Sequence, residues 1–547
     1  MRNFSRRDLF IIGVALISVL IYVLVTRAMV GNLGFPLDDS WIHQTYGRNL
    51  AQTGQFEYVP GVRSAGSTSP FYTVLLAIGY ALHVPYFVWT YALGAVALAL
   101  AGLVGARLAD RVFPTLRGVG LWTGLALVIA WHLVWAAASG METMLFGTLS
   151  LIVIALACGE IESPNAPSEF MESGSGLPDP YKIQFGVGAR QASPADLTKF
   201  PPSKAMGGEV NRFGRGAAFG VIGAILIATR PEGILLVGLL VFLMVIVQPQ
   251  PSPRALVAWI AGALIGGLIG ILPYALLNVS LNGTLLPNTF SAKQAEQAPL
   301  LAQPIWVNLW AMLQPLTAGG QLFLVPGMVW AAVQLIHQRS RTALLYLILL
   351  IWPAALILLY TLRLPAYYQH GRYVIPSLPP LIVLGVGGTL WIVRSSRRTL
   401  ISRVLARSLA TAALLLFVFF WLSGAGYFAR DVQMIDAEMI PAAHWLAQNV
   451  PPDQLLAVHD IGAVGYFAPR PILDLAGLVS PEVVPIILDP VAIMKLMQQR
   501  GTRYLMVLPS QRPAAADDPR LCERFNANGP MGGMTIYELA WDGHCAK

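Results

Sequence analysis

Residues 9–30 read LFIIGVALISVLIYVLVTRAMV, an apolar run that follows three arginines, Arg2, Arg6 and Arg7. An α-helix needs about 20 predominantly apolar residues to cross the hydrocarbon core of a bilayer, and this run is long enough. Arginines directly before a first span keep the preceding end of the chain in the cytoplasm. Because no small-x-small cleavage site follows, we expect the segment to stay in the protein as a signal anchor.

The whole chain has the composition of a polytopic membrane protein. Of its 547 residues 56% are hydrophobic and only 12% are charged, and the mean hydropathy is +0.61. Soluble domains carry about 25% charged residues, so this composition excludes a water-soluble protein. The net charge of +8 does not indicate nucleic acid, because the basic residues form short clusters between apolar runs, where they orient spans.

Ten further apolar runs bring the predicted number of spans to eleven. They lie at 86–106, 118–138, 144–158, 217–229, 233–248, 255–277, 318–336, 342–361, 373–393 and 406–423. The apolar stretch 70–83 is too short to cross comfortably and suits a re-entrant or interfacial helix.

The distribution of basic residues supports this topology. With 70–83 not crossing, the short cytoplasmic segments hold 14 Lys and Arg, whereas the outer loops hold six. A crossing at 70–83 would move the cluster of arginines at 394–407 outside, against the tendency of cytoplasmic loops to be positive. We therefore expect residues 1–423 to form a transmembrane module of the cytoplasmic membrane, with 31–85 as its first outer loop.

Two polar segments stand apart from the spans. Residues 159–216 are rich in Gly, Pro and Ser without apolar periodicity, which predicts a disordered cytoplasmic insertion. Residues 424–547 alternate an amphipathic helix, AEMIPAAHWLAQNV, with the short strands QLLAVH, PILDL, RYLMVLP and MTIYELAW. This pattern predicts a small α/β domain, and an odd number of spans places it outside. We expect a Cys522–Cys545 disulfide there, because that compartment permits oxidation.

The first outer loop carries two adjacent carboxylates, Asp38 and Asp39, in FPLDDSWIHQTYGRNLAQ. One reading is helix capping, since Asp is a good cap and Pro36 precedes the pair. One carboxylate satisfies a cap, so the second still needs a partner, a metal or a substrate. Arg48 lies about two and a half turns further along the same helix and is a candidate partner.

Other charged residues recur at the outer ends of the spans. They are Glu142, Arg230, Glu232, Lys293, His370 and Arg372. Polar residues at span ends are often only interfacial anchors. Their convergence on one face nevertheless suits an anionic ligand beside a reacting hydroxyl. Basic side chains bind a phosphate through charge-assisted hydrogen bonds, and a carboxylate can take a proton.

Five motifs resemble a known family. They are FPLDDSWIHQTYGRNLAQTGQFEYVPGVRSAGSTSPFYTVLLA, ATRPEGILL, LLPNTFSAK, QHGRYVIPSLPPL, and VHDIGAVGYF followed by PRPILDLAGLVSPE. Together they resemble bacterial membrane glycosyltransferases of the GT-C fold. The nearest likeness is to mycobacterial terminal arabinofuranosyltransferases and their uncharacterised relatives, with protein O-mannosyltransferases and the lipid A aminoarabinose transferase more distant. The resemblance covers most of the chain outside 159–216.

The resemblance implies transfer of a sugar from a polyprenyl-phosphate donor to a glycan, lipid or protein acceptor outside the cytoplasmic membrane, with inversion. The family's catalytic carboxylate maps to Asp38, which acts as general base, while Asp39 holds the acceptor, a metal or the loop. We assign the donor phosphate to Lys293, Arg372, Arg230 and His370, and the acceptor rim to Arg48, Glu142 and Glu232. Some relatives hold a divalent cation beside the acidic residue and others do not, so a metal is left open.

Two other classes compete with a transferase. A lipid-linked sugar transporter or flippase would also carry charges within a helix bundle, but such proteins usually contain inverted repeats, and the sequence shows none. A non-catalytic membrane scaffold would have no use for an acidic pair at the membrane surface. The sequence names neither the sugar nor the acceptor.

Overall fold

The computed structural model describes residues 4–64, 66–160, 203–247, 252–283, 288–396, 399–543 and 545. Residues 161–202 of the expected disordered insertion lie outside these ranges. The prediction is wrong at the insertion's C-terminal end, because helix α8 (Ser203–Thr229) already includes residues 203–216. Within that stretch Arg212 pairs with Glu160 at the end of α7 (Thr143–Gly159).

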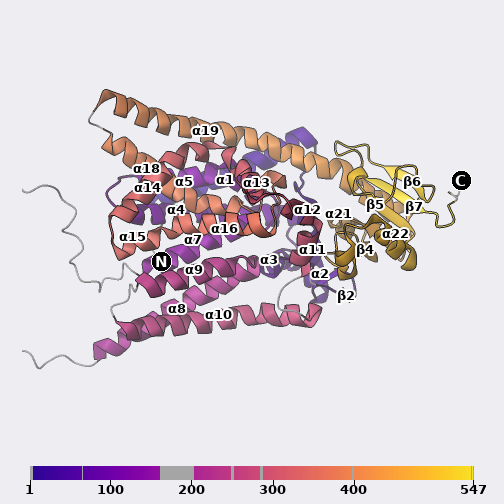
Figure 1. Ribbon diagram of the computed structural model, residues 1–547, viewed down its shortest axis with the longest axis horizontal. Coiled ribbons are helices and arrows are strands. Elements are labelled where there is room, and N and C mark those ends of the chain that lie inside the picture. Colours follow the sequence, from indigo (N-terminus) through magenta and orange to yellow (C-terminus); the bar gives the residue numbers. More distant parts are fainter. Residues whose placement is uncertain are drawn as a thin grey trace, which may run out of the picture.

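Most of the described chain forms a bundle of apolar helices (Figure 1). Within these ranges eight segments are long and apolar enough to cross a membrane, and they comprise α1 (Arg6–Val30), α4 (Tyr86–Val112), α8 from Asn211, α10 (Pro253–Asn282), η3 with α14 (Gly320–His337), α15 with α16 (Ala343–Arg363), α17 with α18 (Tyr368–Ser395), and α19 with its continuation (Leu400–Asn449). The pair α5 (Val119–Ile129) and α6 (Trp131–Ala138), bent by 54°, makes a ninth. The protein is therefore a multi-pass membrane protein.

All eleven predicted spans contain an apolar helix. The remaining two are α7, with 17 residues, and α9 (Gly233–Val247), with 15, both shorter than a full span. In Figure 1 they lie among the longer helices and run along the same axis. The 70–83 stretch is the separate helix α3 (Pro70–Ala81). Its 12 residues extend about 18 Å at 1.5 Å per residue, which is too short for a hydrocarbon core of roughly 30 Å.

Two ends of the bundle are distinct. Three predicted cytoplasmic segments meet at one end, where Arg7 pairs with Asp110 at 2.5 Å and Arg394 donates to the carbonyl of Thr115. The first outer loop lies at the other end, with α2 (Asp38–Thr53) and the hairpin of β1 (Glu57–Val59) and β2 (Val62–Arg63) (Figure 1). The segment after α10 reaches the same end and contains α11 (Asn288–Glu296), α12 (Ala298–Leu301) and α13 (Ile305–Thr317).

The C-terminal region forms an α/β unit beyond the end of the bundle that carries α2 and α11 (Figure 1). Helix α19 (Leu400–Met434) passes position 424 without a break and continues through the π-helix η5 (Ile435–Met439) into α20 (Ile440–Asn449). The unit then contains β3 (Leu456–Val458), α21 (Gly462–Phe467), β4 (Ile472–Asp474), η6 (Pro481–Ile486), α22 (Pro490–Gln499), β5 (Tyr504–Val507), η7 (Pro509–Gln511), β6 (Leu521–Asn526) and β7 (Thr535–Leu539).

These strands form one mixed sheet in the order β4-β3-β5-β7-β6. Strand β3 pairs in parallel with both β4 and β5, whereas β7 pairs antiparallel with β5 and β6. Leu473, Leu505 and Tyr537 are among the side chains that form its separate apolar core. The expected disulfide is present, since Cys522 on β6 is bonded to Cys545 with a Cα–Cα distance of 5.5 Å.

The orientation of the bundle can be tested by labelling. Val491 is 78% exposed on the C-terminal unit, and Gln338 is exposed at the end of α14, in a predicted cytoplasmic segment. In right-side-out membrane vesicles, we expect an impermeant maleimide to label Val491→Cys and to leave Gln338→Cys unlabelled until the membrane is opened with detergent. The native thiols do not compete, because Cys158 is buried and the other two are bonded. The reverse labelling pattern would invert the topology.

Candidate active site

A cavity of about 370 Å³ lies at the end of the bundle that carries α2, beneath the C-terminal unit. Its polar lining comes from six places in the sequence, namely α2, the loop at 66–68, the turn between α6 and α7, the turn between α8 and α9, the segment that carries Lys293 and the segment that carries Arg372. Leu478 of the C-terminal unit also lines it. The cavity thus gathers residues from four of the five motifs that resemble the glycosyltransferases directly, and from the fifth through Leu478.

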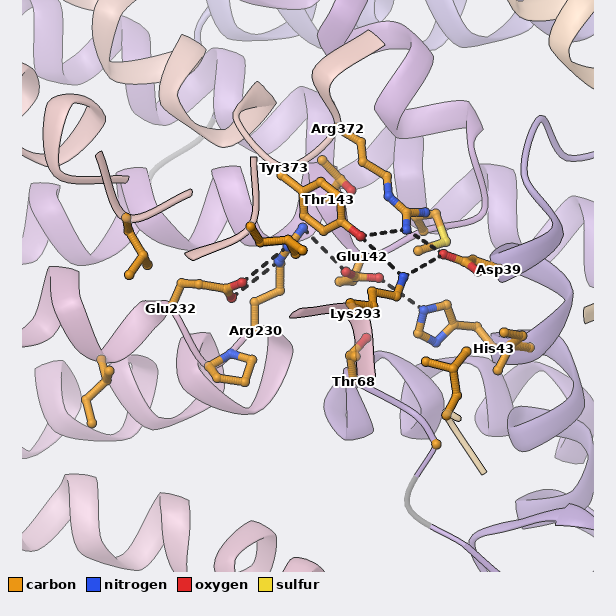
Figure 2. A pocket seen from close by; sticks show the side chains of 18 residues that line it. Asp39, His43, Thr68, Glu142, Thr143, Arg230, Glu232, Lys293, Arg372 and Tyr373 are labelled. Atoms are coloured by element: carbon orange, nitrogen blue, oxygen red, sulfur yellow. Dashed lines mark hydrogen bonds and ion pairs between the residues drawn. The ribbon is translucent and has the colours of Figure 1, made fainter. Parts of the chain in front are cut away.

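One side of the cavity holds a carboxylate between two cations (Figure 2). The Asp39 carboxylate accepts from Arg372 at 2.5 Å and from Lys293 at 3.2 Å, both at the same oxygen, Oδ2. Burial alone would raise the pKa of Asp39, but the positive charges of Lys293 and Arg372 outweigh it and hold the pKa well below its ordinary value. Burial would lower the pKa of Lys293, but the negative charge of Asp39 outweighs it and raises the pKa above its ordinary value. All three groups are therefore ionised.

Tyr373 lies at the centre of the cationic groups. Its hydroxyl accepts from Arg372 at 3.0 Å and from Lys293 at 3.3 Å. The guanidinium of Arg230 also lies 5.4 Å from the centroid of the tyrosine ring. The Nη1 atom of Arg372 is buried without a hydrogen-bond partner in the described chain. Unused donor capacity on a buried guanidinium that faces a cavity suits an anion.

A second cluster lies next to the first and extends from His43 through Glu142 and Arg230 to Glu232 (Figure 2). Glu142 lies 3.2 Å from His43 and 3.7 Å from Arg230. Burial would raise the pKa of Glu142, but His43 and Arg230 outweigh it and lower the pKa to about 2. Arg230 is also 3.4 Å from Glu232 and donates to the hydroxyl of Tyr360 at 2.7 Å. This cluster offers carboxylate, imidazole and hydroxyl groups of the kind that bind sugar hydroxyls.

The remaining wall of the cavity is apolar and opens toward the outside of the bundle. Pro231, Ile234, Leu359 and Leu364 line it, and Ile234 is 66% exposed. Because α9 and α16 (Ile348–Arg363) are apolar segments of the bundle, the exposed side of Ile234 faces lipid. A ligand with a charged head and an apolar chain fits this combination of walls.

Asp38 does not line the cavity. Its two carboxylate oxygens accept from the backbone N–H groups of Gly462 at 2.5 Å and Ala463 at 2.8 Å. Burial and the charge of Asp460 raise the pKa of Asp38 above its ordinary value, although these two hydrogen bonds to the carboxylate lower it. Consecutive residues on a helix point about 100° apart, so only one of the two carboxylates can face the cavity. The prediction that Asp38 is the general base stays a prediction, and the carboxylate that lines the cavity is that of Asp39.

Two more expected site residues lie elsewhere. Arg48 does not pair with the acidic residues but donates to the carbonyls of Tyr466 at 2.7 Å and Gly465 at 3.1 Å. His370 pairs with Asp431 of α19 at 2.7 Å and packs edge-on against Trp131 and Trp135, away from the cavity. His370 precedes Arg372 by two residues in a backbone turn with positive φ, which directs the two side chains apart.

Sequence reasoning missed His43 and Tyr373, which line the cavity, and Tyr360, whose hydroxyl accepts from the cavity residue Arg230. His43 follows Asp39 by four residues on α2, a spacing that places both on one helix face and was a usable signal. Tyr373 is adjacent to Arg372 in the motif QHGRY. Among the described residues, no three His, Cys, Asp or Glu side chains converge as a metal site.

Comparison with known proteins identifies the fold. Residues 428–541 match a domain of unknown function, DUF8728, and no curated protein matches the chain. ArnT from Cupriavidus metallidurans in the apo state is similar, with 15% identity, 99% of this chain and 100% of that chain covered, and a TM-score of 0.57. The oligosaccharyltransferase of Archaeoglobus fulgidus shares 11% identity over 97% of this chain and 75% of its own, with a TM-score of 0.55.

The arabinofuranosyltransferase AftD from Mycobacteria is 14% identical, with 99% of this chain and 42% of that chain covered, at a TM-score of 0.49. That similarity is too low to support the arabinofuranosyltransferase likeness over any other. The matches to ArnT and the oligosaccharyltransferase confirm the GT-C fold that the motifs indicated.

The carboxylate between the two cations predicts a measurable anion site. In Asp39→Asn, Lys293 and Arg372 lose their counter-charge. Removing one partner of a fully buried pair costs about 3–5 kcal/mol, and we expect a loss nearer to 2 kcal/mol because the Asp39 side chain is 26% exposed. The variant should melt below the wild type, and added inorganic phosphate should raise its melting temperature more than that of the wild type.

Asp517→Asn, at an exposed position of the C-terminal unit, is the matched control and should behave as the wild type. Equal phosphate shifts in Asp39→Asn and the wild type would mean that the two cations do not form an anion site.

Proposed function

We propose that this protein is a membrane glycosyltransferase that moves a sugar from a polyprenyl-phosphate donor to an acceptor outside the cytoplasmic membrane. The observation that carries the proposal is the combination of a cationic pair, Lys293 and Arg372, with a lipid-facing apolar wall in one cavity. A polyprenyl-phosphate sugar has the matching parts, an anionic phosphate and a long apolar chain.

Structures of similar fold support the class of donor. ArnT has been solved bound to undecaprenyl phosphate, and this chain resembles that structure with a TM-score of 0.53. The Archaeoglobus fulgidus oligosaccharyltransferase has been solved with an inhibitory peptide and a dolichol-phosphate. Both ligands are long-chain phosphates, so a polyprenyl phosphate is the first ligand to test here.

In the proposed complex the donor phosphate takes the place of Asp39 on the two cations. Beside that position the hydroxyl of Tyr373 accepts from both Lys293 and Arg372. Once the phosphate neutralises the cations, they no longer hold the pKa of Asp39 far below its ordinary value. Donor binding then frees an ionised carboxylate beside the reacting centre.

The reaction is a single displacement. The acceptor hydroxyl attacks the anomeric carbon as the bond from that carbon to the phosphate oxygen breaks, and the electron pair leaves with the polyprenyl phosphate. Asp39 takes the hydroxyl proton as general base. The leaving phosphate is already anionic and is stabilised by Lys293 and Arg372, so no general acid is needed. Displacement from the opposite face inverts the anomeric configuration.

The second cluster is proposed to hold the sugar. Glu142, Glu232 and His43 present hydrogen-bonding groups near Tyr373, and Arg230 links the two halves of the cavity. The motifs that resemble mycobacterial enzymes make arabinofuranose the first sugar to test. The active site and the C-terminal unit are proposed to face the extracytoplasmic side, as the basic residues of the opposite end require.

Transfer by the purified protein is the direct test. With labelled polyprenyl-phosphate arabinofuranose, or the corresponding donors of other sugars, we expect sugar on a cell-envelope glycan, lipid or protein acceptor and release of the polyprenyl phosphate. Asp39→Asn should lower kcat by roughly 10²–10⁴, the usual contribution of a positioned base. Asp517→Asn is again the control.

If Asp39→Asn turned over at the wild-type rate while Asp38→Asn did not, the base would be Asp38 after all. Movement of donor across vesicles without transfer would support a transporter instead.

The donor phosphate assignment has a separate test. Lys293→Met keeps the apolar stem but removes the charge, and a hydrogen bond to a charged group contributes about 1.5–3 kcal/mol. We expect roughly ten- to hundredfold weaker binding of polyprenyl phosphate, measured by fluorescence or calorimetry in detergent. Lys495→Met, on the exposed face of α22, should bind normally. Unchanged affinity in Lys293→Met would remove this lysine from the phosphate site.

A further inference from the structure

Two charged residues of α2 hold the two ends of α21, a six-residue helix of the C-terminal unit. Asp38 accepts from the N–H groups of Gly462 and Ala463, the first two residues of α21. Arg48 donates to the carbonyls of Gly465 and Tyr466 near its other end. The first N–H groups and last carbonyls of a helix have no partners inside it, so both side chains satisfy groups that α21 leaves open.

The signs of the charges match the helix dipole. The N-terminal end of a helix is partially positive and favours a carboxylate, whereas the C-terminal end is partially negative and favours a guanidinium. Asp38 and Arg48 therefore stabilise α21 at both ends, and a swap of their charges would not. Asp38 is only 8% exposed, so its hydrogen bonds are shielded from water.

Glycines permit the close approach of the two helices. A Cβ atom at Gly462 would lie 1.9 Å from the carbonyl oxygen of Asp38, and one at Gly465 would lie 2.1 Å from the hydroxyl of Tyr58. Any larger residue at either position would push α21 away from the first outer loop. Tyr58 also donates to the carbonyl of Ile461, directly before α21.

The segment before α21 reaches a second element of the cavity. His459 lies 3.7 Å from Glu296, which is on α11 one turn beyond Lys293. Burial would lower the pKa of His459, but Asp460 and Glu296 outweigh it and raise the pKa to about 9. The imidazole is thus charged at neutral pH and forms an ion pair with α11. Residues 459–466 therefore contact both the helix of Asp39 and the helix of Lys293.

We propose that Asp38 and Arg48 are positioning residues, which lock the C-terminal unit onto α2 through α21 and so hold Asp39 against Lys293. The inference rests on the proposed function for its kinetic consequence but not for the contact itself. Asp38 is adjacent to Asp39 on the first turn of α2, so any rotation of that turn moves both carboxylates. The C-terminal unit is by this account a part of the active site, although it supplies only Leu478 to the cavity lining.

Positioning and base catalysis predict different responses to substitution. A base is lost equally in Asp38→Asn and Asp38→Ala. In the positioning role, asparagine keeps one acceptor oxygen and alanine keeps none, so the losses are graded. We expect kcat/KM to fall about tenfold in Asp38→Asn and about a hundredfold in Asp38→Ala, as for one and two hydrogen bonds to a charged group. Arg48→Gln should fall about tenfold as well.

The double variant sharpens the test. Asp38 and Arg48 do not contact each other and act through the same short helix, so their effects should not add. We expect Asp38→Ala with Arg48→Gln to be no worse than Asp38→Ala alone. Arg63→Gln is the matched control, because Arg63 is exposed on the same loop and bonds only locally to Gln55. Additive losses, or equal abolition by Asp38→Asn and Asp38→Ala, would overturn the positioning role.

Hydrogen exchange of the full-length protein gives a readout that needs no substrate. In Asp38→Ala, the amides of Gly462 and Ala463 should exchange at least tenfold faster than in the wild type, while the amides of β5 and β7 stay protected and show that the sheet is folded. Unchanged exchange at Gly462 and Ala463 would disprove the contact. If Asp38→Ala showed the expected faster exchange but the wild type had no transferase activity, the proposed function would be disproved and the contact between Asp38 and α21 would stand.

Discussion

The ion pairs of Asp39 with Lys293 and Arg372 are the interaction on which the outer end of this molecule depends. Two cations buried close together in a protein strongly destabilise the folded state unless a counter-charge lies beside them. Asp39 supplies that charge, and it joins α2, α11 and the segment before α18 (Leu378–Ser395), which are far apart in the sequence. A single carboxylate oxygen between two donors is also easily replaced by a phosphate oxygen. The same contact therefore stabilises the two cations and suits the proposed exchange of Asp39 for the donor phosphate.

The geometry of α2 explains why the sequence places two aspartates side by side. A helix turns about 100° per residue, so neighbours face different surroundings. Asp39 faces the cavity, whereas Asp38 faces the C-terminal unit and accepts from Gly462 and Ala463. The helix itself begins at Asp38 after Leu37, and no side chain caps it. The capping interpretation thus had the right chemistry, but Asp38 serves the N-terminal end of α21 and not that of its own helix.

Much of the fold follows from the sequence because a bilayer imposes simple rules. Apolar length located a helix at all eleven predicted spans, and the short run at 70–83 is the separate helix α3. Four strands of the sheet were also predicted from their patterns. Strand β6 was missed because LCERFN does not alternate regularly, and a bulge interrupts its pairing between Glu523 and Phe525. The site was harder, since charge at span ends indicates a shared face but not which way each side chain points.

The turn before Arg372 determines the directions of two side chains, which the pattern of charges in the sequence does not predict. Gln369 and His370 both have φ near +55°, a conformation that non-glycine residues adopt only when their surroundings hold it. His370 is fixed by Asp431, whose carboxylate also accepts from Trp135 at 2.9 Å. Asp431 is on α19, the helix that leads into the C-terminal unit. That unit is therefore tied to both partners of the Asp39–Arg372 ion pair, through α21 to the helix that carries Asp39 and through α19 to the turn that presents Arg372. A small displacement of the unit would change the distance between Asp39, the proposed base, and Arg372, the proposed phosphate-binding cation, so in the proposed reaction its docking determines the chemistry and not only the stability.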